Sequence, residues 1–113
     1  MLSKIQKIKK KKDFNEIFKK GKTFKDGFLI SKIIKNNLDK SRFAFIVSQK
    51  VSKKAVVRNK IRRRFEQIIR LNLKNIKVGV DVVLIALPGI EKENFLSIQK
   101  SINNLLIKTK IIF

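Results

Sequence analysis

Apolar residues recur along the chain at two different spacings, and these spacings separate predicted helices from predicted strands. Between residues 13 and 20, Phe14, Ile17 and Phe18 follow a helical period, with an aspartate before them and a glycine after them. The pattern predicts a short amphipathic helix. The basic residues before it, within 1–12, predict an extended or frayed tail.

Strict alternation follows in the second quarter of the chain. In "RFAFIVS" (42–48), Phe43, Phe45 and Val47 point to one face and the residues between them to the other. The β-branched segment 28–35 predicts a second strand, which we expect to pair antiparallel with 42–48. A short extra strand is predicted near residues 23–24.

The segment from about residue 53 to residue 73 predicts a long helix with one apolar side and one basic side. The apolar side contains Val57, Ile61, Phe65, Ile68 and Leu71. The other side contains Arg58, Asn59, Arg62, Arg63 and Arg70. Arg64 falls on the apolar side, where its long side chain must reach past the edge of the helix to keep its charge in water.

The segment "VGVDVVLIALPG" (78–89) is apolar on both faces, which predicts a central strand. Residues 91–110 predict a closing helix with a buried stripe through Phe95, Ile98 and Ile102. The predicted order is therefore α-β-β-α-β-α, with the short extra strand. It indicates a single α+β domain over 1–113, in which helices cover one face of a small sheet.

The charge narrows the possible functions. Lys and Arg number 29 and Asp and Glu 8, which gives a formal net charge of +21. Such a charge repels itself in the folded chain, so a polyanionic partner is expected. Nucleic acid is the leading candidate, and an anionic membrane is the second. A lysine-rich background composition is not a sufficient explanation of the charge, because it does not account for the arginines clustered at 58–64.

Several kinds of site are excluded by composition. The chain has no Cys and no His, which rules out disulfides, Cys/His zinc sites and histidine bases. The eight acids are scattered, so we expect neither a catalytic residue nor a metal site. No apolar run suits a membrane span or a signal peptide, so we expect a cytoplasmic protein.

The long basic helix is the candidate nucleic-acid-binding element. Arginine side chains bind phosphate oxygens with a planar fork of donors, and a helix N-terminus also favours anions. We expect RNA contacts from Lys50, Lys53, Lys54, Arg58, Asn59, Lys60, Arg62 and Arg63. Glu66 is the only acid between Lys50 and Leu73, which argues against a helix held mainly by its own salt bridges.

Phe14 and Phe18 lie among lysines on the short first helix. Either residue can belong to the core or can stack on an unpaired base in a groove beside the basic helix, and the pattern leaves both roles open. The strand "SRFAFIV" looks like the RNA-binding strand of an RRM domain. It lacks the glycine and one aromatic residue, and the element order is wrong, so we interpret this match as chance.

The combination of several motifs is more specific. "SRFAFIVSQKVSKKAVVRNKIRRRFEQ", followed by "GVDVVLIALPG" and preceded by "KKKDFNEIFKKG", closely resembles the protein subunit of bacterial ribonuclease P. The resemblance extends from about residue 9 to residue 108. Its strongest part is the Arg-Asn-Arg signature, here Arg58, Asn59 and Lys60, followed by Arg62 and Arg63.

The resemblance implies both a fold and a role. The fold is αβββαβα with a left-handed βαβ crossover, like domain 2 of ribosomal protein S5, whereas general rules predict a right-handed crossover. The role is that of a protein cofactor for a catalytic RNA, which holds Mg²⁺ and cleaves the 5′ leader from precursor tRNA. The implied partners are ribonuclease P RNA and the single-stranded leader, which Phe14 and Phe18 border in a cleft. No protein partner or membrane is implied.

Three positions depart from the family pattern. Lys60 replaces the usual Arg, which keeps the charge and loses the fork. Glu66 stands where Arg is common. Ser31 stands where some members carry a cleft aromatic, so stacking is expected to rest on the two phenylalanines.

Two alternatives remain open at this point. One is a small basic RNA-binding module of ribosomal type, with no role in cleavage. The other is a DNA-binding protein that uses residues 55–70 as a recognition helix, although no helix precedes it as a helix-turn-helix requires.

Overall fold

The computed structural model describes residues 5–109. Three α-helices and four strands follow one another in the order αβββαβα, with a 3₁₀ turn after the second helix and another before the third. The elements are α1 (Lys11–Lys20), β1 (Lys22–Asp26), β2 (Leu29–Lys35), β3 (Arg42–Ile46), α2 (Ala55–Asn72), η1 (Leu73–Asn75), β4 (Val80–Ala86), η2 (Ile90–Lys92) and α3 (Phe95–Lys108). The predicted α+β class and element order are confirmed.

The four strands form one mixed sheet in the order β1-β2-β4-β3. β4 runs antiparallel to β2 and parallel to β3, and it separates these two strands. The predicted central position of β4 is confirmed, because an apolar strand needs neighbours and cover on both sides. The predicted pairing of 28–35 with 42–48 is wrong, because β4 occupies the place between them.

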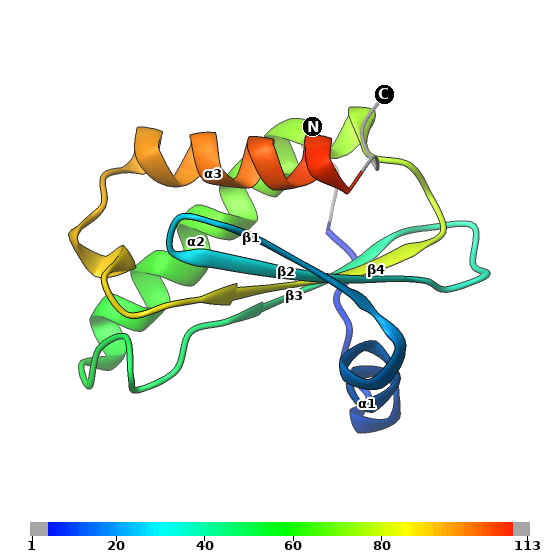
Figure 1. Cartoon of the computed structure of the whole chain (residues 1–113), viewed down its shortest axis with the longest axis horizontal. Helices are drawn as coiled ribbons and strands as arrows, with labels where there is room; N and C mark the ends of the chain where they lie inside the picture. The colour runs from blue at the N-terminus through cyan, green and yellow to red at the C-terminus, as the bar shows by residue number, and fades with distance from the viewer. Residues whose placement is uncertain (1–4, 110–113) are drawn as a thin grey trace.

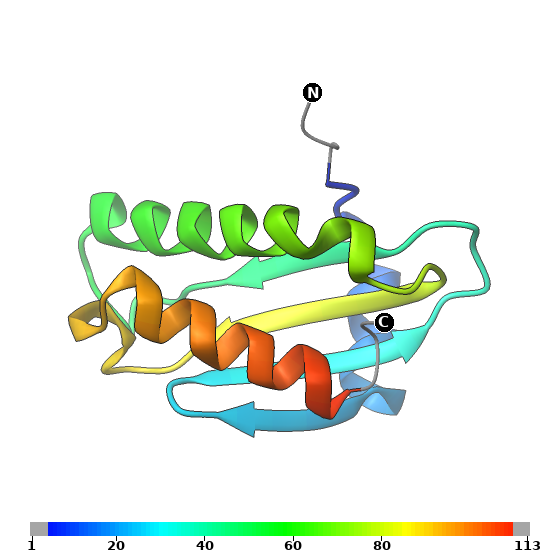
Figure 2. The same ribbon diagram turned by 90° about the horizontal axis from the view of Figure 1, so that it is seen from above.

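The crossover connection from β3 through α2 to β4 is left-handed, which is uncommon for two parallel strands of one sheet. Figure 2 looks at the sheet from the side of α2 and α3. There β3 and β4 run in the same direction while α2 returns in front of them, and the turn from one strand to the next is left-handed. The hand implied by the family resemblance is confirmed, against the general preference for right-handed crossovers.

The sheet is covered on both faces. α2 and α3 pack on one face, with Phe43, Leu84 and Ile102 in the larger apolar core. α1 lies on the other face, where Ile17 packs with Ala44 and Val83 in a smaller core (Figure 1). The prediction that the helices cover one face is therefore wrong for α1. Because strand residues alternate between faces, Ala44 and Val83 need cover of their own.

The segment before α1 is part of the fold. Ile5 and Ile8 are buried, and Lys7 forms an isolated parallel bridge with Phe43 at the free edge of β3. The Phe43 N–H donates to the Gln6 carbonyl and the Ile8 N–H to the Phe43 carbonyl, both at 2.9 Å. Of the two predicted states of the tail over 1–12, residues 5–10 are extended rather than frayed, residues 11–12 belong to α1, and residues 1–4 lie outside the described residues. Covering an edge strand in this way satisfies its backbone groups.

α2 is buried along the side that its sequence predicts. Ile61, Phe65 and Ile68 are buried, whereas Leu71 is 59% exposed, which corrects its predicted place in the core. Arg64 lies at the edge of the apolar side, and its Nη1 donates to the Glu93 carbonyl at 3.3 Å. This hydrogen bond gives the guanidinium a polar partner at the edge of the apolar face.

Candidate nucleic-acid interface

The basic residues begin in the connection that leads into α2. Lys50, Lys53 and Lys54 are exposed, and the Lys54 N–H donates to the Ser52 hydroxyl at 3.2 Å, which shapes the last turn before the helix. The first turn of α2 has neither an acidic residue nor a side-chain cap. Its free N–H groups therefore add a partial positive charge to that of the three lysines.

The signature residues of α2 differ in their exposure and in their hydrogen bonds to the rest of the protein. Lys60 and Arg63 are exposed, as the sequence predicts. Arg58 is partly buried, and its Nη1 donates to the Ser52 carbonyl at 2.9 Å, so it also ties the preceding turn to the helix. Arg62 Nη2 donates to Asn59 Oδ1, a contact that fixes the direction of the Arg62 fork and leaves the Asn59 amide group as a free donor.

A cleft of about 500 Å³ brings part of this set together with an aromatic residue. Asn59, Arg62 and Arg63 line one wall, and Phe14 of α1 lies on another. The remaining lining residues are Lys7, Ile8, Phe43, Ala44, Phe45 and Glu66. We call this cavity the arginine cleft. It combines a stacking surface with phosphate-binding side chains, which suits a single-stranded nucleic acid.

The remaining predicted residues lie outside the arginine cleft. Lys50, Lys53, Lys54, Arg58 and Lys60 do not line it. Phe18 is 44% exposed on α1, with the Lys32 ammonium 5.6 Å from its ring centroid. This distance suits a cation–π contact, so Phe18 already has one cationic neighbour.

The structure corrects the role considered for Ser31. Its side chain is 2% exposed, and it faces Leu84 across the β2–β4 pair. Because Leu84 belongs to the core beneath α2 and α3, Ser31 points away from the face that carries α1. A residue at this position cannot line a cleft beside Phe14.

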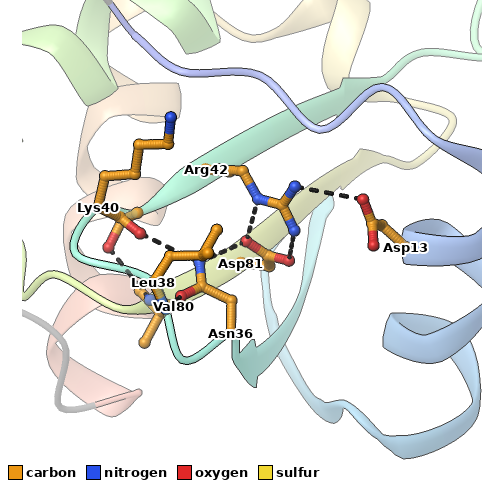
Figure 3. A network of polar contacts seen from close by, with 8 residues as sticks. Asp13, Asn36, Leu38, Lys40, Arg42, Val80 and Asp81 are labelled. Carbon is orange, nitrogen blue, oxygen red and sulfur yellow. Dashed lines mark hydrogen bonds and ion pairs between the residues drawn. The ribbon is translucent and has the colours of Figure 1, made fainter.

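A polar network holds α1 against the sheet (Figure 3). Arg42 of β3 donates from Nε and Nη2 to the two oxygens of Asp81, at 2.9 and 2.6 Å, and from Nη1 to Asp13 of α1 at 3.2 Å. The Asn36 amide also donates to Asp81, at 2.7 Å. The hydrogen bond to Asp81 is the main cause of a raised pKa for Arg42. The bidentate pair joins β3 to β4 and orients the guanidinium, whose Nη1 then ties α1, the helix that carries Phe14, to the sheet.

Glu66 is the acidic residue within the cleft wall. Its carboxylate accepts from Lys7 Nζ at 3.4 Å and from Arg70 Nη2 at 3.2 Å. Glu66 is therefore shared between Lys7 and Arg70, and neither Arg62 nor Arg63 has an acidic partner among the described residues. The sequence identified Glu66 as a departure from the family pattern, but not its two partners.

Two further observations limit the chemistry. Among residues 5–109, no three His, Cys, Asp or Glu side chains gather closely enough to hold a metal ion. No helix within the same residues is long and apolar enough to cross a membrane.

Comparisons with known proteins show the family and the fold of the chain. The family model described as Ribonuclease P matches residues 2–110. The chain belongs to the ribonuclease P protein family. It is 42% identical to the ribonuclease P protein component of Clostridioides difficile (strain 630), over 92% of this chain and 91% of that protein. It is 36% identical to the component of Alkaliphilus metalliredigens, over 94% of this chain and 95% of that protein.

Solved structures of ribonuclease P proteins show the same fold. The protein from Staphylococcus aureus superposes with a TM-score of 0.88 at 30% identity, over 97% of this chain and all of that chain. The protein from Thermotoga maritima gives a TM-score of 0.81 at 30% identity, over 89% of this chain and 94% of that chain. The resemblance identified in the sequence is thus confirmed, and the chain is a protein component of an endoribonuclease.

Sequence reasoning missed some residues of the arginine cleft. Lys7 and Ile8 were assigned to the tail, although two isoleucines three residues apart among lysines signal a buried edge. Phe45 was placed only on one face of its strand, with no role in a cleft. It lines the arginine cleft and also packs on Phe65 of α2, with ring centroids 6.3 Å apart.

Proposed function

We propose that this protein binds ribonuclease P RNA and the single-stranded 5′ leader of precursor tRNA, and thereby promotes removal of the leader. The observation that carries the proposal is the arginine cleft, where Phe14 lines the same cavity as Asn59, Arg62 and Arg63. Family membership supports the same role.

The residues divide the work by their chemistry. Arg62 and Arg63 bind backbone phosphates, and Asn59 orients the Arg62 fork through their hydrogen bond. Arg58, Lys60 and the three lysines before α2 extend the positive surface toward the open helix N-terminus. Phe14 and Phe18 supply aromatic faces for unpaired bases.

Within the proposal, the partner RNA supplies the catalytic groups and holds the Mg²⁺ ions. The placement of the acids supports this division. Asp13 and Asp81 bind Arg42, and Glu66 binds Lys7 and Arg70. Carboxylates neutralised by neighbouring cations are poorly placed to recruit a divalent ion. The protein's own contribution is therefore affinity and the choice of substrate.

A cleavage assay tests this function. A precursor tRNA with a 5′ extension is incubated with the protein alone, with a bacterial ribonuclease P RNA alone at low magnesium, and with both. Cleavage at the mature 5′ end is expected to be fast only with both. If the protein accelerates none of several such RNAs, a general RNA-binding module becomes the better description of the chain.

Phe14→Ala and Phe18→Ala are expected to weaken binding of leader-bearing precursor tRNA more than binding of mature tRNA. A stacked base contributes about 1–3 kcal/mol, so the ratio of the two affinities should fall about fivefold or more for each residue that stacks. The two affinities would be measured by filter binding with the partner RNA present.

Phe28→Ala is the matched control for these variants. Phe28 lies in the β1–β2 turn and is 40% exposed, close to the 44% of Phe18, but it does not line the arginine cleft. The precursor-to-mature ratio should stay unchanged in this variant. Equal losses for both substrates in Phe14→Ala would instead assign Phe14 to the core around Ile17.

A further inference from the structure

A second cavity, of about 740 Å³, adjoins the arginine cleft. The segment before α1, the β2–β3 connection and the C-terminal half of α2 form its walls. Six cationic side chains and two carboxylates line it, together with Ile5, Gln6 and Leu38. The cations are Lys7, Lys9, Lys10, Lys40, Arg42 and Arg70, and the acids are Asp13 and Glu66. We call it the lysine cavity.

Only some cations of the lysine cavity already bind carboxylates of the protein. All three guanidinium nitrogens of Arg42 bind Asp81 or Asp13, so Arg42 contributes little to a ligand. Lys9, Lys10 and Lys40 form no ion pair with any described residue. Figure 3 shows the Lys40 side chain directed away from the Asn36–Asp81 network, to which it contributes only its carbonyl. Three ammonium groups are therefore available.

Arg70 has unused donor capacity at the same place. Its Nη2 binds Glu66, but its buried Nε has no hydrogen-bond partner among the described residues. A buried guanidinium donor without an acceptor is unfavourable, and an anion that reoriented the fork would relieve it.

The pair Lys7–Glu66 marks the boundary between the two cavities, because both residues line both of them. Each cavity lies next to the other, and each has cations without acidic partners. A polyanionic strand bound in the arginine cleft can therefore extend past Glu66 into the lysine cavity.

We propose that the lysine cavity is a second phosphate site, which binds a phosphodiester group of the RNA through Lys9, Lys10, Lys40 and Arg70. The inference rests on the proposed function, since it assumes that RNA is the partner. RNA is favoured over a small free anion because the cavity is continuous with a cleft already suited to a nucleic-acid strand. Glu66 competes with this phosphate for Arg70 and Lys7.

The test compares the salt dependence of RNA binding in two double variants. Lys10→Gln/Lys40→Gln removes two charges from the lysine cavity. Lys92→Gln/Lys100→Gln removes two exposed charges on η2 and α3, away from both cavities, and controls for the loss of net charge. The slope of log K against log salt should fall by about 0.7–0.9 for each lost phosphate contact in the first variant and change little in the second. Equal slopes in the two variants would overturn the proposal.

Glu66→Gln is expected to change RNA affinity in the opposite direction. It frees Lys7 and Arg70, so RNA binding should tighten by more than in Glu93→Gln, which removes one acid outside both cavities. Equal tightening in these two variants counts against a phosphate site beside Glu66.

Titration with inorganic phosphate tests whether the ligand is a small free anion instead of RNA. The titration is followed through the amide resonances of residues 9, 10 and 40. Saturable binding of free phosphate, combined with slopes equal to the control, would replace RNA by a small anion.

The failure of this inference is separable from failure of the proposed function. If wild-type protein does not accelerate the partner RNA, the proposed function fails first. If it does accelerate that RNA, and only the lysine-cavity variants behave like their controls, then the second phosphate site alone is wrong.

Discussion

Asp81→Ala is expected to lower the free energy of unfolding by about 3–5 kcal/mol, because it removes the main counter-ion of a guanidinium that lies mostly inside the fold. Asp81 is 4% exposed in its side chain and Arg42 is 20% exposed. Alanine removes both hydrogen bonds of the bidentate pair and also the acceptor of Asn36. The guanidinium then keeps only the longer contact to Asp13.

Urea unfolding, followed by circular dichroism, measures this loss. Asp81→Asn keeps the shape of the side chain and one acceptor, so its loss should be smaller than that of alanine. Glu16→Ala breaks the exposed pair of Glu16 with Lys20 and should cost no more than about 1 kcal/mol. A loss in Asp81→Ala as small as that of Glu16→Ala would show that the network does not stabilise the fold.

Arg62→Ala/Arg63→Ala is expected to have the largest effect on RNA binding. Both guanidinium groups line the arginine cleft, and neither binds a described carboxylate. A hydrogen bond to a charged group contributes about 1.5–3 kcal/mol, so each lost contact should weaken binding about tenfold or more at low salt. The salt slope should fall by about one for each phosphate released.

Fluorescence anisotropy of a labelled leader RNA at several salt concentrations measures both quantities. Lys92→Ala/Lys100→Ala removes the same formal charge from exposed positions outside the cleft and isolates the specific contacts. Arg58→Ala would be a weaker test, because its hydrogen bond to Ser52 mixes helix stability with binding. A slope in the arginine variant equal to that of the lysine control would refute the role of the cleft.

The sequence predicted correctly which face of the sheet each strand residue lies on, but it did not predict which strands pair with each other. Alternation correctly assigned Phe43 and Ala44 to opposite faces of the sheet, because the period of a strand is local. It could not determine that β4 lies between β2 and β3, since pairing is a long-range choice. The same limit explains α1, whose apolar residues predicted a helix but not the face it would cover.

The site shows a similar division. The helical period correctly placed Arg62 and Arg63 opposite Ile61 and Phe65, but it could not show that Phe14 lies across one cavity from them. Asp81 was taken for a scattered surface acid, although a lone carboxylate in an apolar strand signals a buried partner. That partner, Arg42, is distant in sequence and was not predicted.

The position of β4 has a consequence for synthesis on the ribosome. β2 and β3 share no edge and meet only through β4, which is made after both of them. A nascent chain that ends before residue 80 can form helices and the β1–β2 hairpin, but β3 then has no strand of the sheet to pair with. The four-stranded sheet can therefore be completed only after β4 has left the ribosome, late in translation.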